Sequence, residues 1–176
     1  MKKLVLILLL FLTACGPMKG DYRIIEKPTI NRSPLQGRWV VTKIQALTDE
    51  SVDLRPVIGS DAIFAPDGAL FNDQRIDHPT YVIRKGKTDY LMKVGYNKTK
   101  DDVGIAGDNL FIIDIYQDEE KLFTVYREKD DVAYIDIYGN LLQLVKTKGT
   151  LDERQLQNLM EQADPKRTYY SRVPGK

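Results

Sequence analysis

Cysteine, histidine and tryptophan each occur once in this chain of 176 residues. One cysteine excludes an internal disulfide framework, and one cysteine with one histidine excludes a zinc site of the Cys/His type. The same scarcity excludes most nucleophile–histidine pairs. An excess of one charge is also lacking, because 26 Lys and Arg face 25 Asp and Glu. Nucleic acid is therefore not expected as a partner, since phosphate binding needs a concentrated basic surface.

Long apolar runs are lacking as well. A membrane-spanning helix needs roughly 20 apolar residues, whereas residues 4–12 form an apolar run of nine that follows Lys2 and Lys3. A basic start, a run of this length and small residues after it are typical of a secretory signal peptide. Cys15 follows at once in the order Leu-Thr-Ala-Cys, which resembles the lipobox of bacterial lipoproteins.

The lipobox resemblance implies that residues 1–14 are removed and that Cys15 is acylated, with palmitate among its lipids. It further implies a cell-envelope protein bound to the membrane through this lipid. Gly16, where an Asp would retain the protein, implies the outer membrane, facing the periplasm, if the source is Gram-negative. Loss of the two N-terminal lysines leaves 24 basic against 25 acidic side chains. Residues 15–34 are rich in Gly and Pro and predict a lipidated N-terminus and tether.

From residue 35 onward the sequence is typical of short β-strands. Residues 37–46 start at a Gly, are rich in β-branched side chains, and predict a first strand. Pro66-Asp67-Gly68 predicts a turn, because Pro presets φ and Gly accepts a positive φ. Eight or nine strands with short connections predict an antiparallel meander closed into a barrel. The further strands are expected at residues 62–64, 69–71, 81–84, 89–94, 110–116, 121–127, 132–138 and 141–145, with turns at 85–87 and 139–140 and a loop at 95–108.

Alternation in three of these strands separates two faces. One face carries Asp114 and Asp136, while the opposite face carries no carboxylate. Because an unpaired buried carboxylate is costly, we expect the face without carboxylates to point inward. The inward set is Phe111, Ile113, Ile115, Phe123, Val125, Ala133, Ile135 and Ile137.

The end of the chain predicts one helix. Thr150 and Glu153 fit a capping box, and apolar residues then recur at helical spacing. We expect this stripe to pack against the sheet, and a partner-binding role is the alternative. Residues 164–176 form a basic tail. The stripe is Leu156, Leu159, Met160 and Ala163.

Gly37 and Trp39 on the first strand, the meander and the final helix together resemble the lipocalin family and its short bacterial relatives. The resemblance covers residues 35–163 and implies a lipocalin-like β-barrel. It also implies that Trp39 closes the base of the barrel against a basic residue from a late strand, for which Arg127 and Lys146 are the candidates. Thr88-Asp89-Tyr90 matches the second family motif, although it follows the tryptophan sooner than in full-length members.

Motifs for catalysis are absent from the sequence. It contains no Gly-rich phosphate loop, no Gly-x-Ser-x-Gly and no His-Glu-x-x-His, and His78 stands alone in a predicted loop. The acidic pairs fall at predicted turns and lack the alternating pattern of a calcium loop. The sequence therefore predicts neither an enzyme nor a bound metal or cofactor.

Two functions are compatible with these patterns. The lipocalin resemblance implies a small apolar or amphipathic ligand held in the barrel mouth. The alternative is a non-enzymatic interaction subunit of an envelope complex or an immunity protein. An internal cavity favours the first function, whereas a filled barrel with an exposed tyrosine face favours the second. The candidate ligand-binding residues are Tyr90, Met92, Phe111, Ile113, Phe123 and Val125.

Overall fold

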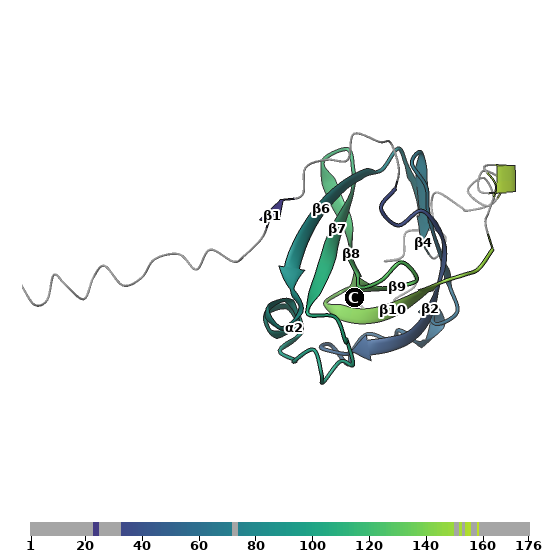
Figure 1. The fold of residues 1–176 in the computed structure, drawn as a ribbon. Helices are drawn as coiled ribbons and strands as arrows, with labels where there is room; N and C mark the ends of the chain where they lie inside the picture. Colours follow the sequence, from purple (N-terminus) through teal and green to yellow (C-terminus); the bar gives the residue numbers. More distant parts are fainter. Residues whose placement is uncertain are drawn as a thin grey trace, which may run out of the picture.

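The structure, a computed structural model, describes residues 23–24, 33–71, 74–149, 152, 154, 155 and 158. Within these residues ten strands form one antiparallel sheet in the order β1-β6-β7-β8-β9-β10-β2-β3-β4-β5, which curls around a core (Figure 1). The strands are β1 (Arg23–Ile24), β2 (Gly37–Ala46), β3 (Asp61–Phe64), β4 (Gly68–Phe71), β5 (Gln74–Asp77), β6 (Thr80–Lys87), β7 (Asn109–Gln117), β8 (Glu120–Arg127), β9 (Val132–Ile137) and β10 (Asn140–Lys146). The helices are η1 (Arg55–Val57) and α2 (Thr88–Tyr96).

The predicted antiparallel meander is confirmed. The expected first strand has the bounds of β2, and β3, β4 and β7 to β10 match their predicted ranges within one residue at either end. Pairing between strands does not close into a ring in the described part of the chain, because β1 and β5 remain its two edges. The structure therefore shows a curled meander sheet that is open between β1 and β5 in the described residues.

The strand expected at residues 89–94 is wrong, because this segment is helix α2. Its buried residues are Thr88, Leu91, Met92 and Tyr96, and that spacing follows the 3.6-residue period of a helix. Asn97 ends the helix in the left-handed conformation, with φ of 52°. The composition of this short apolar run is compatible with a strand as well as a helix. The spacing of its buried residues distinguishes the helix from the strand.

The turn expected at residues 85–87 is also wrong, since β6 continues through Lys87. Gly86 is required there by a close approach. A Cβ at this position would lie 3.0 Å from Leu91 Cδ1 and 3.2 Å from Ile112 Cδ1. The missing side chain therefore lets α2 pack closely against the sheet.

Two smaller corrections concern hairpins. The last turn consists of Tyr138 and Gly139, both with positive φ, because Asn140 already pairs with Ile137. The Asn140 side chain instead accepts hydrogen bonds from the Thr48 and Asp49 backbone N–H groups, at 2.7 and 3.1 Å. Strand β5 was not expected from the sequence; its pattern has only Ile76 buried among polar residues.

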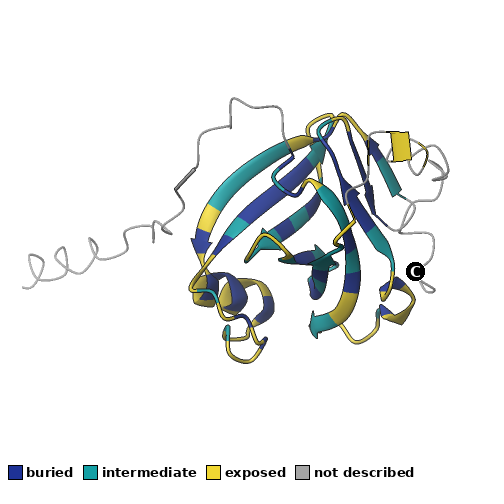
Figure 2. Cartoon of the chain, turned by 45° about the vertical axis from the view of Figure 1, so that its right-hand side comes forward, coloured by how far each residue is buried: buried dark blue, intermediate teal, exposed yellow. Residues whose placement is uncertain are grey.

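Two hydrophobic cores lie on opposite faces of the sheet. The inner core gathers side chains from β2 to β5 and from β7 to β10, including Ile113, Phe123 and Val125. The predicted inward face of β7, β8 and β9 therefore agrees with the structure, except that Phe111 is only half-buried. The outer core lies between the sheet and α2, whose buried and exposed sides are visible in Figure 2.

Trp39 is buried at the start of β2, with 1% of its surface exposed. Its indole Nε1–H donates to the Leu35 carbonyl at 2.7 Å, and Lys146 Nζ lies 5.6 Å from the ring centroid. Of the two basic candidates, Lys146 is the one on the tryptophan, while Arg127 donates to the Pro34 carbonyl at 2.9 Å. Gly37 has a φ of 129°, and a Cβ there would lie 2.7 Å from Lys146 Cε.

Few residues of the predicted C-terminal helix are described. Arg154, Gln155 and Asn158 are helical, and Asp152 and Gln155 cap each other's backbone N–H groups at 3.1 and 2.7 Å. Asp152 and Gln155 therefore form a capping box, while the predicted pair, Thr150 and Glu153, lies outside the described residues. The apolar stripe, the tail, the signal segment with Cys15 and most of the tether lie outside the described residues. No helix in the described part is long and apolar enough to cross a membrane.

Candidate functional site

The six candidate ligand-binding residues do not surround one cavity. Ile113, Phe123 and Val125 belong to the inner core, while Met92 is fully buried in the outer core. Tyr90 is 41% exposed on α2. The other member, Phe111, is half-buried at the start of β7. The helix at 88–96 accounts for this separation, because it moves Tyr90 and Met92 to the outside of the sheet.

Side chains from opposite walls of the curled sheet meet across its interior. The rings of Phe71 on β4 and Phe123 on β8 meet edge to face, with centroids 5.5 Å apart. These strands are five positions apart in the sheet order, so their contact crosses the interior. The Tyr81 hydroxyl on β6 similarly donates to the Ala65 carbonyl at 2.9 Å, beside the β3–β4 hairpin.

A small cleft opens where β8 and β9 separate. The two strands pair from Thr124, opposite Asp136, to Arg127, opposite Ala133. Before Thr124, a shift in the β7–β8 register leaves Leu122 as a bulge, and bulges bend a strand away from its neighbour. The cleft has a volume of about 80 Å³, room for two or three waters at about 30 Å³ each. Its lining residues are Gln74, Glu120, Lys121, Leu122, Phe123, Asp136, Ile137 and Tyr138.

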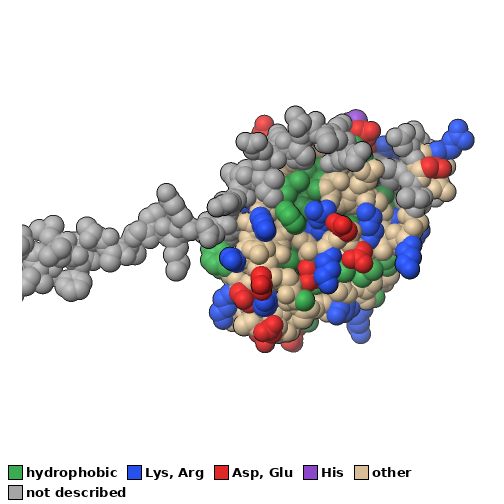
Figure 3. Space-filling model, in the orientation of Figure 1, with side chains coloured by type: hydrophobic (Ala, Val, Ile, Leu, Met, Phe, Trp, Pro, Cys, Tyr) green, Lys and Arg blue, Asp and Glu red, His purple; other side chains and the backbone are tan. Residues whose placement is uncertain are grey.

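Charged side chains surround this cleft. Asp136 accepts the Tyr96 hydroxyl at 2.6 Å and the Gly139 backbone N–H at 3.0 Å. Lys121 Nζ lies 3.9 Å from Asp114 Oδ1. Basic and acidic side chains also lie interspersed on the face of the molecule seen in Figure 3. The cleft therefore presents mixed polar and apolar lining without a strong field of one sign.

Beside the cleft, the outer face of the sheet holds a buried polar network. Asp114 is 2% exposed, forms an ion pair with Arg84, and accepts the Thr124 hydroxyl at 2.8 Å. The sequence prediction that the carboxylate-bearing face points outward holds, but this part of the face is covered. Pairing and hydrogen bonds offset the desolvation cost of the buried carboxylate.

Burial keeps the two tyrosines of this network, Tyr96 and Tyr126, in their protonated form. Burial raises the pKa of Tyr96 far above its usual value, and the neighbouring Tyr126 and Asp136 raise this pKa further. The pKa of Tyr126 is also raised, chiefly by burial. Both phenols therefore keep their protons at neutral pH, and neither is suited to act as a general base.

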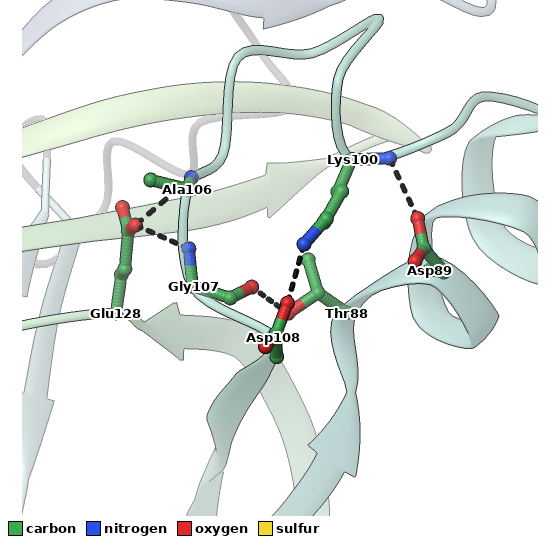
Figure 4. Close-up of polar contacts among 7 residues, drawn as sticks. All are labelled: Thr88, Asp89, Lys100, Ala106, Gly107, Asp108 and Glu128. Atoms are coloured by element: carbon green, nitrogen blue, oxygen red, sulfur yellow. Dashed lines mark hydrogen bonds and ion pairs between the residues drawn. The ribbon is translucent and has the colours of Figure 1, made fainter.

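The loop at 97–108 is fixed against α2 and β8, as Figure 4 shows. Glu128 Oε1 accepts the Ala106 and Gly107 N–H groups at 3.1 and 2.9 Å. The Thr88 hydroxyl donates to the Gly107 carbonyl, and Lys100 forms an ion pair with Asp108. Thr88 therefore begins α2 and secures a loop, whereas the sequence had suggested it as part of a family motif.

Glu128 and Asp114 are organising residues that sequence reasoning missed. The Tyr134 hydroxyl donates to Glu128 Oε2 at 2.7 Å, so this carboxylate joins the loop to β9. No local pattern marks either role, because Arg84 lies 30 residues from Asp114 and Gly107 lies 21 residues from Glu128.

Comparisons with known proteins give no assignment. No family model, no curated protein and no solved structure matches this chain. Its function is therefore inferred from the residues and geometry above.

Residues that could hold a metal or act as a nucleophile are not gathered in the described structure. In the ranges that the structure covers, no group of three or more His, Cys, Asp and Glu could hold a metal ion. His78 has a positive φ of 49° in the turn between β5 and β6. The tyrosines expected to form an outer contact face are mostly covered: Tyr134 is 1% exposed, and Tyr116, Tyr126 and Tyr138 are half-buried.

Proposed function

We propose that this chain is a lipid-anchored lipoprotein of the bacterial envelope whose folded domain binds a protein partner and does not catalyse a reaction. The anchor is Cys15, and the support for it is sequential: a basic start, an apolar run of nine residues and Leu-Thr-Ala-Cys. A lipocalin-like barrel is part of the same proposal. Its support is the Gly37-x-Trp39 start of β2, the Lys146 side chain over Trp39, and the curled meander.

The contact between Phe71 and Phe123 carries the choice of a protein partner. Binding sites for drug-sized ligands usually measure about 300–1,000 Å³, and these two rings meet across the interior that such a ligand would occupy. A partner then contacts the outside of the sheet. The cleft at Leu122 is the favoured contact point, because it combines apolar Phe123 and Ile137 with a polar rim.

Site-specific photo-crosslinking tests this function. A photoreactive phenylalanine analogue replaces Leu122 in one variant and the exposed Lys43 in a control, and both are expressed in the native host. We expect one discrete protein adduct from position 122 and none from position 43. Equal adducts from both positions, or no adduct from position 122, would contradict a partner site at the cleft.

A small amphipathic ligand at the cleft is the second candidate function. It is favoured by the mixed lining of the cleft, in which Leu122 and Phe123 adjoin Glu120 and Lys121. At about 80 Å³ the cleft would hold only part of such a molecule. Thermal denaturation with a panel of fatty acids separates the two functions. A saturable rise in melting temperature that Phe123→Ala removes would favour the ligand over the protein partner.

A further inference from the structure

One end of the curled sheet carries two cations around a single aromatic ring. Lys85, Phe111 and Arg127 lie opposite one another on β6, β7 and β8, because Lys85 pairs with Phe111 and Phe111 with Arg127. Directly opposite residues share a face of the sheet. Lys85 Nζ lies 5.9 Å from the Phe111 centroid, and Arg127 Cζ lies 5.2 Å from it.

A third cation stands on the same face at the end of β10. Lys146 pairs with Trp39 on β2, and its Nζ lies 5.6 Å from the indole centroid. Trp39 belongs to the inner core, so Lys146 also points toward the inner face. We call Lys85, Arg127 and Lys146 the basic mouth.

In the part of the chain that the structure describes, no carboxylate forms an ion pair with the basic mouth. Within the described residues, the ion pairs join Arg38, Arg55, Arg75, Arg84, Lys100 and Lys121 to aspartates, and none includes a cation of the basic mouth. Lys85 and Arg127 contact a ring, and Arg127 also donates to a carbonyl. Aromatic contacts position such side chains and leave their charge available to an external anion.

The chain enters the domain beside the basic mouth. Arg127 donates to the Pro34 carbonyl at 2.9 Å, just before β2. Further upstream, β1 pairs with β6 at Arg84 and Lys85, and Figure 1 shows β1 alongside β6. Cys15 lies eight residues before β1, a stretch that can span at most about 29 Å. Covalent connection therefore holds this end of the domain near position 15.

We propose that the basic mouth contacts the membrane surface and binds the headgroups of anionic phospholipids. This inference rests on the proposed acylation of Cys15, which brings the bilayer within reach. Stable membrane attachment usually combines a lipid with a second signal, and cations beside the chain entry would supply it. Each Lys or Arg near an anionic surface strengthens binding by roughly fivefold. The same contact orients the cleft at Leu122 relative to the membrane.

Vesicle sedimentation of the unacylated mature chain tests the inference separately from the anchor. The protein is residues 15–176 with Cys15→Ser, and the vesicles contain phosphatidylcholine with or without phosphatidylglycerol. We expect binding only to vesicles with phosphatidylglycerol, and loss of this binding at 1 M salt, where the Debye length is about 3 Å. Lys85→Gln and Arg127→Gln should each weaken binding about fivefold.

Two further variants make the result specific. Arg127→Lys keeps the charge and should bind like the parent, which separates charge from any loss of the Pro34 contact. Lys43→Gln with Lys98→Gln removes two exposed cations elsewhere and should also bind like the parent. Lys85→Gln is also combined with Arg127→Gln. Equal losses in the Lys43 and Lys98 control and in this combined variant, or binding that neither change affects, would overturn the proposal. The lipid on Cys15 is tested by processing in cells, so failure of the anchor has its own readout.

Discussion

At the scale of single residues, buried charge in this protein depends on one close cation. Asp114 is buried in the outer face of the sheet, and Arg84 is its ion-pair partner. Removing one member of a buried pair leaves the other without compensation, whereas replacing both with apolar groups is often nearly neutral. The Arg84–Asp114 pair therefore adds little to the free energy of unfolding. Its main role is to fix how the outer face of the sheet packs.

We predict that Arg84→Ala lowers the free energy of unfolding by about 3 kcal/mol, because Asp114 stays buried and keeps only the more distant Lys121, whose Nζ lies 3.9 Å away. The double variant Arg84→Met with Asp114→Leu should recover most of this loss. Urea denaturation of Arg84→Met, Asp114→Leu and the double variant measures the coupling. Additive losses would mean that the two residues act independently.

Trp39 is the residue on which the start of β2 depends. It is 1% exposed and held by the Leu35 carbonyl. Trp39→Ala should cost about 3–5 kcal/mol, as large core truncations do. The native protein should also show the blue-shifted emission of a buried indole, which is unambiguous because the chain has one tryptophan. Val94→Ala, at a position that is 69% exposed, is the control and should leave stability nearly unchanged.

Ionisation of the buried Tyr81 is expected to lower the free energy of unfolding at alkaline pH. Burial raises the pKa of Tyr81 to about 12, against an ordinary value of 10.0. A group with a raised pKa in the folded state contributes stability below its unfolded pKa, and this contribution is lost as the pH rises toward the folded value. We therefore expect stability to fall between pH 10 and 12, and to fall less steeply in Tyr81→Phe. Parallel denaturation curves at pH 9, 10 and 11 provide the measurement, and identical slopes would exclude this role.

At the scale of elements, the β7–β8 hairpin is strained. Its two central residues, Asp118 and Glu119, have φ of 51° and 81°. Two-residue hairpins with positive φ at both positions favour Asn-Gly or Asp-Gly, because side chains disfavour that conformation. The acidic run there is therefore a turn, as its composition predicted, but with an unfavourable residue at the second position.

Glu119→Gly should raise the free energy of unfolding by about 1 kcal/mol, since it removes this backbone strain. Asp130→Gly serves as a control in the neighbouring turn, where φ is not positive. The control should give no gain, because glycine there only adds freedom to the unfolded chain. Chemical denaturation of both variants compares them directly, and a gain in the control as large as in Glu119→Gly would point away from strain.

At the scale of the whole molecule, two surfaces of the domain are proposed to have separate uses. The cleft at Leu122 is proposed to receive a partner, and the basic mouth is proposed to contact the membrane. These surfaces lie at opposite ends of β8, because the cleft adjoins Glu120–Phe123 and Arg127 is the last residue of the strand. Such an arrangement would hold the cleft away from the bilayer.

The anchor itself is tested in the intact cell. Cys15→Ser should leave a precursor that retains residues 1–14, because cleavage of a lipobox signal follows acylation of the cysteine. Cell fractionation and intact mass of the purified protein report both steps. Normal processing and membrane retention of the variant would refute the anchor.

The sequence by itself determined the elements whose pattern is local. Alternation with period two separated the faces of β7, β8 and β9 and identified the inward residues Ile113 and Val125, while β-branched composition marked β2. These features depend on a few adjacent residues, so they can be recognised without knowing the fold. The scarcity of cysteine and histidine likewise excluded a disulfide framework and a Cys/His zinc site without knowledge of the fold.

Only the tertiary structure decided which surfaces can function. Residues 88–96 form a helix because the outer face of the sheet buries Leu91 and Met92, and no local pattern separated that outcome from a strand. Phe71 meets Phe123, and Lys85 aligns with Arg127, across long separations in sequence. The bulge at Leu122 likewise results from the register between β7 and β8. Such contacts depend on strand order and register, which many sequences with the same alternation could satisfy differently.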